Sequence, residues 1–153
     1  MVAPMNSDDR YDSLYRCYAQ EYGNDWLYLK AQGRQESGFN PDAVNLRSGC
    51  KGVAQFADAT FAQWSRQLKI KNPSVWNPEH SIRCQAAYMR WLTDRLDGEL
   101  LKALAAYNWG IGNLQRLLAE APATWRAALP GETHEYIAII PKTYEQYRRE
   151  IRC

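Results

Sequence analysis

The chain has 153 residues, of which 46% are hydrophobic and 24% charged, and its formal net charge is +2 at pH 7. This length favours one domain over residues 1–153, and the apolar content excludes a disordered chain. So small a charge, without a run of Lys or Arg, argues against nucleic acid as a partner. No apolar stretch reaches the ~20 residues of a membrane-spanning helix, so we expect no stable membrane insertion.

Apolar residues at helical spacing predict seven helices and no regular sheet. The helices are expected over residues 8–22, 26–37, 58–68, 78–96, 99–108, 113–119 and 133–152. Ser7 and Asn24 are the expected N-caps of the first two helices, and Asn77 followed by Pro78 marks the start of the fourth. Pro141 removes one backbone hydrogen bond, so we expect the last helix to be kinked or divided there.

Gly, Asn, Pro and Ser residues mark three predicted loops between these helices. The loops are expected over residues 38–51, 69–76 and 120–131, with one helical turn at Trp125–Leu129 in the third. A short β-hairpin can form within residues 40–56. The predicted fold class is therefore all-α, or mainly α with at most this hairpin.

The sequence contains four cysteines, Cys17, Cys50, Cys84 and Cys153, which permit two disulfides in three connectivities. Buried thiols in a cytosolic protein are one interpretation. Action in an oxidising compartment would instead favour at least one bridge. There is no CxxC motif and no Cys/His spacing typical of zinc, so we expect neither a metal nor a cofactor.

Residues 34–56, RQESGFNPDAVNLRSGCKGVAQF, place one carboxylate, Glu36, in the last turn of a predicted helix. A predicted loop follows this helix, and Gln55 lies in residues 52–56, directly after that loop. A carboxylate at a helix end, facing a loop with backbone donors, can serve as an acid–base group. Taken alone, a solvated glutamate beside a connecting loop is the simpler interpretation.

The order and spacing of three blocks resemble the soluble lytic transglycosylases and goose-type lysozymes. In that family a Glu-Ser pair precedes Phe/Asn-Pro-x-Ala and Gly-x-x-Gly-Leu-Met-Gln. The corresponding residues here are Glu36-Ser37, Phe39-Asn40-Pro41-Asp42-Ala43 and Gly49-Cys50-Lys51-Gly52-Val53-Ala54-Gln55. The family's Ala-Tyr-Asn-x-Gly and Glu-Thr-x-x-Tyr-Val motifs are matched by Ala106-Tyr107-Asn108-Trp109-Gly110 and Glu132-Thr133-His134-Glu135-Tyr136-Ile137. The resemblance covers roughly residues 25–140.

This resemblance implies a lysozyme-like fold and cleavage of the β-1,4 bond between MurNAc and GlcNAc in peptidoglycan. It makes Glu36 the sole general acid and base, which would leave a 1,6-anhydro-MurNAc product. The implied substrate-binding residues are Ser37, Gln55, Phe56, Tyr107, Asn108, Glu132 and Tyr136. The expected partner is the glycan strand of peptidoglycan, and we expect a monomer.

Two alternatives stay open at this point. A goose-type lysozyme would hydrolyse the same bond and would usually need a second carboxylate. Asp42 matches no catalytic carboxylate of the family, and Asp58 looks like a helix cap. A non-catalytic wall-binding or virion structural module would be indicated by loss of Glu36 or Tyr136, and both are present. The first residues show neither the basic nor the apolar region of a signal peptide. This suggests a phage endolysin, another export route, or a periplasmic enzyme whose signal peptide has been removed.

Overall fold

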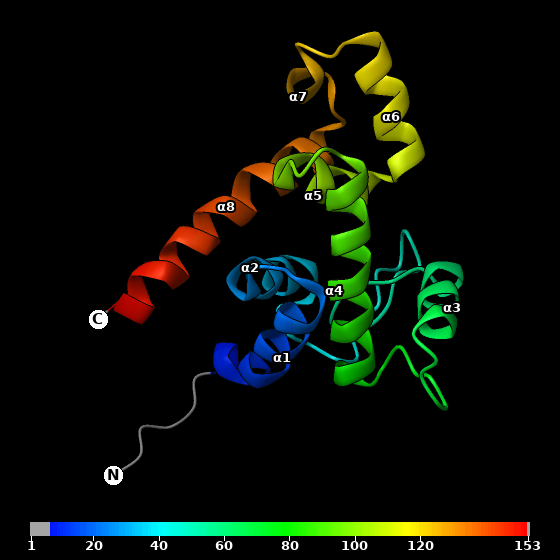
Figure 1. Cartoon of the computed structure of the whole chain (residues 1–153), viewed down its shortest axis with the longest axis vertical. Helices are drawn as coiled ribbons and strands as arrows, with labels where there is room; N and C mark the ends of the chain where they lie inside the picture. Colours follow the sequence, from blue (N-terminus) through cyan, green and yellow to red (C-terminus); the bar gives the residue numbers. More distant parts are fainter. Residues whose placement is uncertain (1–6, 153) are drawn as a thin grey trace. The chain divides into compact units, whose positions relative to one another are not determined.

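The computed structural model describes residues 7–152, and within this range all the regular elements are helices (Figure 1). The elements are η1 (Ser7–Asp9), α1 (Asp12–Tyr22), α2 (Trp26–Ser37), α3 (Asp58–Gln67), α4 (Pro78–Arg95), α5 (Leu100–Trp109), α6 (Ile111–Glu120), α7 (Trp125–Ala128) and α8 (Gly131–Arg152). The described residues contain no sheet, only two isolated antiparallel bridges, Val44–Lys51 and Lys51–Phe56. The predicted mainly α fold class, with at most a short hairpin, is confirmed.

The described chain separates into two compact units that divide after Tyr88, within α4. The first unit contains α1, α2, α3 and the beginning of α4, and the second contains the rest of α4 and α5 to α8. The single domain that the chain length predicts stays a prediction. Among the described residues, no helix has both the length and the apolar character needed to cross a membrane.

In the first unit, α1 packs against α2 at Gly33. A Cβ atom added at Gly33 would lie only 2.0 Å from the hydroxyl oxygen of Tyr15, a fully buried residue. The Tyr15 ring meets Phe39 edge-on, with centroids 6.3 Å apart. The absence of a side chain at Gly33 therefore leaves room for the Tyr15 ring against α2, one turn before Glu36.

Buried amides join α2 to α4 in the same unit. The side-chain nitrogen Nε2 of Gln85 donates to the carbonyl oxygen of Leu29 at 3.1 Å and to Oε1 of Gln32 at 2.9 Å. Both glutamines are fully buried. Because an unpaired buried amide is costly, these bonds fix how the two helices face each other.

An ion cluster fixes the beginning of the described chain against α2. The ammonium of Lys30, a residue only 4% exposed, lies 3.0 Å from Asp9 and 2.9 Å from Asp12. Arg34 approaches Asp8 at 3.6 Å. Burial raises the pKa of Asp12 above its usual value, although the hydrogen bond from Lys30 acts in the opposite direction.

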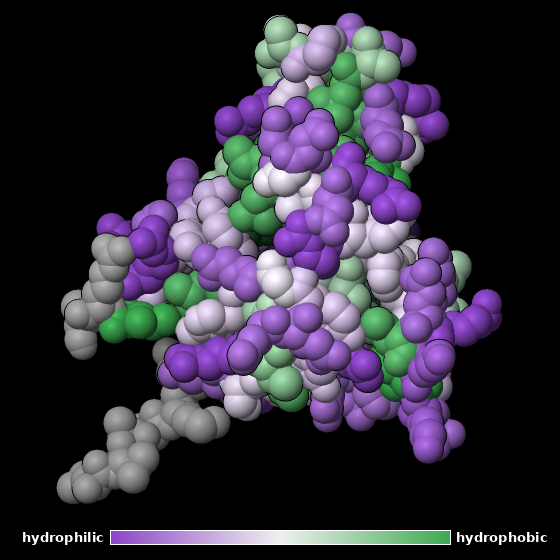
Figure 2. Space-filling view, in the orientation of Figure 1, coloured by the Kyte–Doolittle hydropathy of each residue, from purple (hydrophilic) through white to green (hydrophobic). Residues whose placement is uncertain are grey.

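In the second unit, α5 packs against both α6 and α8. The largest fully buried aliphatic side chains here come from these three helices and from the end of α4. They are Leu92, Leu104, Leu114, Ile137 and Ile140. Helix α8 continues through Pro141, so it is not divided there. The space-filling view shows a mainly hydrophilic surface on which hydrophobic residues form small islands (Figure 2).

Two local expectations need correction. The first α-helix begins at Asp12, because residues Ser7–Asp9 form a 3₁₀ turn instead. Helix α2 is capped by Asp25, whose Oδ1 accepts a hydrogen bond from the backbone N–H of Leu27 at 3.0 Å. Asn24, the expected cap, instead donates its side-chain amide to the carbonyl of Ala86.

The cysteines that the structure describes carry free thiols. Cys17 is exposed, Cys50 is half-buried and Cys84 is buried. These three provide no support for a disulfide, and Cys153 lies outside the described residues. The described part of the chain also holds no group of three or more His, Cys, Asp or Glu side chains able to bind a metal ion.

Candidate active site

Glu36 lies half-buried in the last turn of α2. The helix ends at Gly38, whose N–H donates to the carbonyl of Arg34 at 2.9 Å. Gly38 and Phe39 both adopt left-handed backbone angles, with φ of 59° and 64°. This conformation is uncommon for a bulky residue such as Phe39, which is 3% exposed and held by the Tyr15 ring. The chain therefore turns sharply just after Glu36.

Ser37 connects the end of α2 to the segment that precedes Gln55. Its hydroxyl donates to the carbonyl oxygen of Val53 at 2.7 Å and also lies 3.3 Å from the carbonyl of Gly33. The segment is anchored from its other side by Ser81 of α4, whose Oγ accepts a hydrogen bond from the N–H of Ala54. The structure thus joins Ser37, the residue after Glu36, to the 52–56 segment.

Gln55 braces the loop that carries it. Its Nε2 donates to the carbonyl oxygens of Ala43 at 3.1 Å and Gly52 at 2.9 Å, which uses both amide hydrogens. Paired backbone bonds between Lys51 and Phe56, each 3.0 Å long, close the same turn. The Gln55 side-chain oxygen is the atom that can still accept a hydrogen bond from a ligand.

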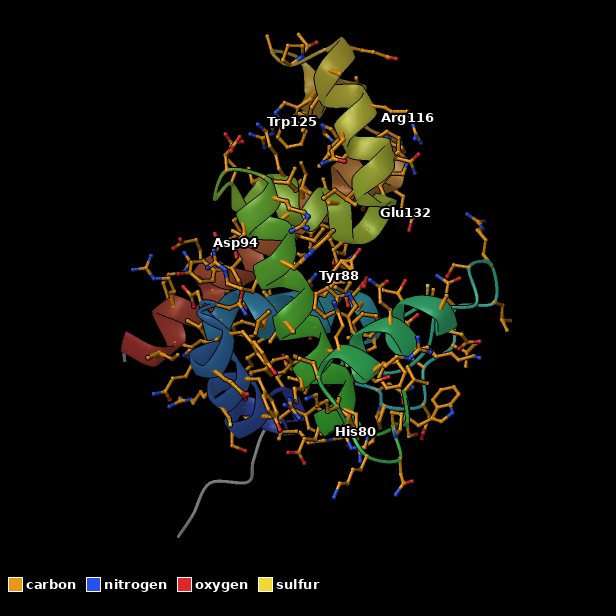
Figure 3. The ribbon with its side chains drawn as sticks, turned by 45° about the vertical axis from the view of Figure 1, so that its right-hand side comes forward. His80, Tyr88, Asp94, Arg116, Trp125 and Glu132 are labelled. Carbon is orange, nitrogen blue, oxygen red and sulfur yellow. The ribbon has the colours of Figure 1, made fainter. Side chains whose placement is uncertain are left out.

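Phe56 stands inside the first unit. It is 3% exposed, and its ring lies 6.0 Å from the Phe61 ring and 6.3 Å from the Tyr88 ring, measured between centroids. Tyr88 is labelled in Figure 3, and burial raises the pKa of its hydroxyl. Phe56 therefore anchors the loop in the core of the first unit. The burial of its ring disfavours the predicted contact between that ring and a sugar.

The remaining predicted site residues belong to the second unit. Tyr107 and Asn108 are half-buried near the end of α5, whereas Glu132 is exposed in the first turn of α8 (Figure 3). Tyr136, one turn further along α8, is 3% exposed. The hydroxyl of Thr133 donates to Oδ1 of Asn108 at 2.8 Å, so it joins the second and third sequence motifs.

Most other carboxylates of the first unit are engaged by neighbouring groups or exposed to solvent. Asp58, the first residue of α3, is 74% exposed at its side chain and forms an ion pair with Lys51 at 3.0 Å. Asp25 caps α2, and Asp9 and Asp12 contact Lys30. Asp42 is exposed in the loop.

Two further acids of this unit are also engaged. The hydroxyl of Tyr18 donates to Glu79 at 2.6 Å, and Glu21 lies 3.9 Å from Arg83. Glu36 is therefore the only half-buried carboxylate at the turn between α2 and the 52–56 segment.

The sequence did not predict that Ser81, Thr133 and Val75 support the site. Ser81 is bonded to Ala54 and Thr133 to Asn108, as described above. A Cβ added at Gly52 would lie only 2.3 Å from the carbonyl oxygen of Val75. Thr133 belongs to a recognised motif, so a signal existed for it. Ser81 and Val75 lie outside every motif, and only their contacts identify them.

Comparison with known proteins bears on this arrangement. Residues 13–128 match the family model described as the transglycosylase SLT domain. The chain is 37% identical over 120 residues to the membrane-bound lytic murein transglycosylase F of Marinobacter nauticus, which covers 73% of this chain and 22% of that protein. It is 33% identical over 119 residues to the protein of the same name from Alteromonas mediterranea, at 72% and 24% coverage. The chain thus spans about a quarter of the length of these curated relatives.

The fold is similar to solved structures of the same class. The 70 kDa soluble lytic transglycosylase from Escherichia coli matches with a TM-score of 0.84 at 22% identity, over 94% of this chain and 25% of that one. An inactive variant of the lytic transglycosylase Slt from Pseudomonas aeruginosa matches with a TM-score of 0.84 at 25% identity, with the same coverage. These matches confirm the predicted lysozyme-like fold.

Proposed function

The chain belongs to the transglycosylase SLT domain family, and we propose that it is a lytic transglycosylase acting on peptidoglycan. It cleaves the β-1,4 bond between MurNAc and GlcNAc and leaves a 1,6-anhydro-MurNAc end. One observation carries this proposal. Glu36 is half-buried at the end of α2, beside a segment that Ser37 holds in place through its bond to Val53. The protein acts at the cell wall.

In the proposed mechanism, Glu36 performs both proton transfers. Its protonated carboxyl gives a proton to the glycosidic oxygen as the bond from that oxygen to C1 of MurNAc breaks. The resulting carboxylate then takes the proton of the O6 hydroxyl of the same sugar, and O6 bonds to C1. Because O6 is tethered to the reacting ring, it has a large effective-concentration advantage over water.

The carboxylates of the first unit support this reaction over hydrolysis. A lysozyme-type reaction normally uses a second carboxylate as nucleophile or as base for water. Asp58 is engaged by Lys51 and points its largely exposed carboxylate into solvent. Asp42 lies exposed in the loop. A goose-type lysozyme remains the alternative, and Asp42 would be its first candidate for the second carboxylate.

The other site residues bind the saccharide in this proposal. Gln55 offers its side-chain oxygen, and Asn108, whose own oxygen is held by Thr133, offers its amide nitrogen. Tyr107 supplies an apolar face and a hydroxyl for a sugar ring. Glu132 and Tyr136 complete the set, as the family motif implies.

The experiment is a product analysis with purified peptidoglycan and three proteins. We expect the wild type to release muropeptides that are lighter by one water than hydrolytic products and that borohydride cannot reduce. Glu36→Gln should lose activity by about 10⁴-fold or more, since a single acid–base group contributes about 10²–10⁴-fold and Glu36 serves twice.

Asp58→Asn is the matched control, because it makes the same chemical change at an exposed carboxylate. It should keep activity within about threefold, because a solvated ion pair contributes little. Reducible MurNAc ends would establish the lysozyme alternative. A wild-type protein that binds peptidoglycan without cleaving it would establish the non-catalytic module.

A further inference from the structure

A cavity of about 450 Å³ opens on the first unit between α3 and the loop that follows it. Its lining residues are Phe61, Ala62, Ser65, Arg66, Ile70 and Pro73. This volume is typical of small-ligand pockets, which span about 300–1,000 Å³. The cavity contains none of the residues assigned to the saccharide or to catalysis.

The cavity is formed by backbone that is already fixed. The N–H of Ile70 donates to the carbonyl of Ser65 at 3.0 Å, which closes the end of α3. Further along the loop, the N–H of Ser74 donates to Nδ1 of His80 at 3.2 Å (Figure 3). The Ser65 hydroxyl is 3.2 Å from the carbonyl of Ala62, within its own helix. The pocket therefore needs little rearrangement to accept a ligand.

The walls combine apolar side chains with a single positive charge. Phe61, Ile70 and Pro73 provide aromatic and aliphatic surface, and Arg66 is the only charged lining residue. Arg66 is exposed and forms no salt bridge with any described residue, and the same is true of Lys69 and Lys71 on the adjoining loop. A guanidinium beside an apolar slot suits a carboxylate attached to a small apolar group.

The pocket shares one wall with the loop of the proposed active site. The Phe61 ring lines the cavity and also contacts Phe56, with centroids 6.0 Å apart. Phe56 directly follows Gln55 and is bonded to Lys51 by both backbone groups. A ligand in the pocket would thus be separated by a pair of aromatic rings from the segment that Ser37 joins to α2.

We propose that this pocket binds the free carboxyl terminus of a peptide side chain of peptidoglycan. Arg66 binds the terminal carboxylate through two hydrogen bonds from its guanidinium. Phe61, Ile70 and Pro73 contact the methyl groups of the terminal alanine residues. This inference rests on the proposed function, which makes peptidoglycan the substrate. One cation among apolar walls does not suit a polyanion, whose charges would require several lining cations.

The test is an NMR titration of the full chain with N-acetyl-D-Ala-D-Ala and with its C-terminal amide. We expect the acid to bind at millimolar concentration and to shift the signals of Phe61 and Ile70. The amide should bind at least about tenfold more weakly, because it lacks the charge that Arg66 recognises. Sodium acetate at equal concentration should not displace the peptide, because it lacks the apolar part.

Two variants complete the test. Arg66→Gln should weaken binding of the acid by at least about tenfold. Arg47→Gln is the control, because it removes another exposed arginine of the same unit that does not line the pocket. It should change the affinity for the acid by less than about twofold. Equal binding of acid and amide, displacement by acetate, or binding that does not depend on Arg66 would each overturn the proposal.

Cleavage of glycan strands stripped of their peptides separates this inference from the proposed function. If the wild type cleaves them but does not bind the acid, the pocket proposal fails alone. If it binds the acid through Arg66 but cleaves no glycan, the proposed function fails and the peptide site stands.

Discussion

At the scale of single residues, two glycines of one loop differ only in what surrounds them. Gly49 and Gly52 have φ of 77° and 81°, but a Cβ at Gly49 would meet nothing within 4 Å, whereas one at Gly52 would lie 2.3 Å from the carbonyl oxygen of Val75. Gly49→Ala should therefore cost only the left-handed strain, about 1–2 kcal/mol. Gly52→Ala should cost about 2 kcal/mol more, because backbone must move.

Urea unfolding of both variants measures this difference in the free energy of unfolding. The Gly52→Ala variant should also lose activity, because Gly52 accepts a hydrogen bond from Gln55. Equal losses of stability in the two variants would mean that the loop of Val75 shifts freely, and the rigid support argued for this segment would be wrong.

Cys84 is a second residue whose behaviour follows from its surroundings. Burial raises the pKa of its thiol from 9.0 to about 12, and the residue is fully buried. The thiol should stay protonated and resist alkylation by iodoacetamide at pH 8, whereas the exposed Cys17 should react. Mass spectrometry with peptide mapping identifies the modified residues, and rapid modification of Cys84 in folded protein would contradict its burial.

The same pKa shift links Cys84 to stability at high pH. Between pH 9 and about 12 the thiol is ionised in the unfolded chain but protonated in the folded chain. The unfolded state then binds fewer protons than the folded state, so the free energy of unfolding falls as pH rises through this window. Replacing Cys84 by Ala should remove this part of the pH dependence.

At the scale of helices, the contact of α1 with α2 depends on the missing side chain at Gly33. A Cβ at this position would lie 2.0 Å from the Tyr15 hydroxyl oxygen and 3.0 Å from Cζ of the same ring. Gly33→Ala should thus destabilise the protein by about 1–3 kcal/mol through overpacking. Adding Tyr15→Phe removes the closest atom and should recover part of the loss.

Thermal melts of the single and double variants measure this coupling in a double-mutant cycle. If the two changes are additive, the Tyr15 hydroxyl and Gly33 are not in contact, and the contact between the two helices does not depend on this glycine. Gly33→Ala should also lower activity per folded molecule, because Glu36 lies less than one helical turn beyond Gly33 on α2. The double variant should recover part of this activity.

Helix starts were predictable from sequence where the signal was local. Asn77 followed by Pro78 marks the start of α4, and Oδ1 of Asn77 accepts a hydrogen bond from the N–H of Glu79 at 2.9 Å, as a cap should. The cap of α2 was misassigned by one residue, because Asn24 is recruited by Ala86, which is 62 residues away in sequence. A local pattern cannot report such a partner.

The same distinction applies to the candidate site. The motif order predicts Glu36 and Ser37 as site residues, and the structure joins Ser37 to the 52–56 segment. The support from Ser81 and the close approach of Val75 to Gly52 arise from chain segments brought together only by folding. The burial of Phe56 was likewise not evident, since an aromatic residue after a loop suits either a core or a binding surface.

At the scale of the whole molecule, helix α4 decides whether the chain unfolds in one step. The division between the two compact units falls inside this helix, after Tyr88. Fully buried residues stand on both sides of the division, with Ile82 and Ala86 before it and Leu92 after it. Because i→i−4 hydrogen bonds run across the division, loss of one unit should fray the helix on which the other depends. We therefore predict a single cooperative transition, as expected of one domain.

Leu104→Ala tests this prediction, because Leu104 is a fully buried residue of α5 in the second unit. The change should cost about 2–5 kcal/mol, as buried leucine truncations do. If unfolding is cooperative, the free energy of opening measured by hydrogen exchange should fall by the same amount for the slowest amides of α2 and of α5. The conservative change Ile137→Val, at another fully buried position of this unit, should lower the free energy of opening in α2 and α5 equally but by less, about 0.5–1.5 kcal/mol. Faster exchange in α5 with unchanged exchange in α2 would show two units that unfold separately, and the length-based prediction of a single domain would then be wrong.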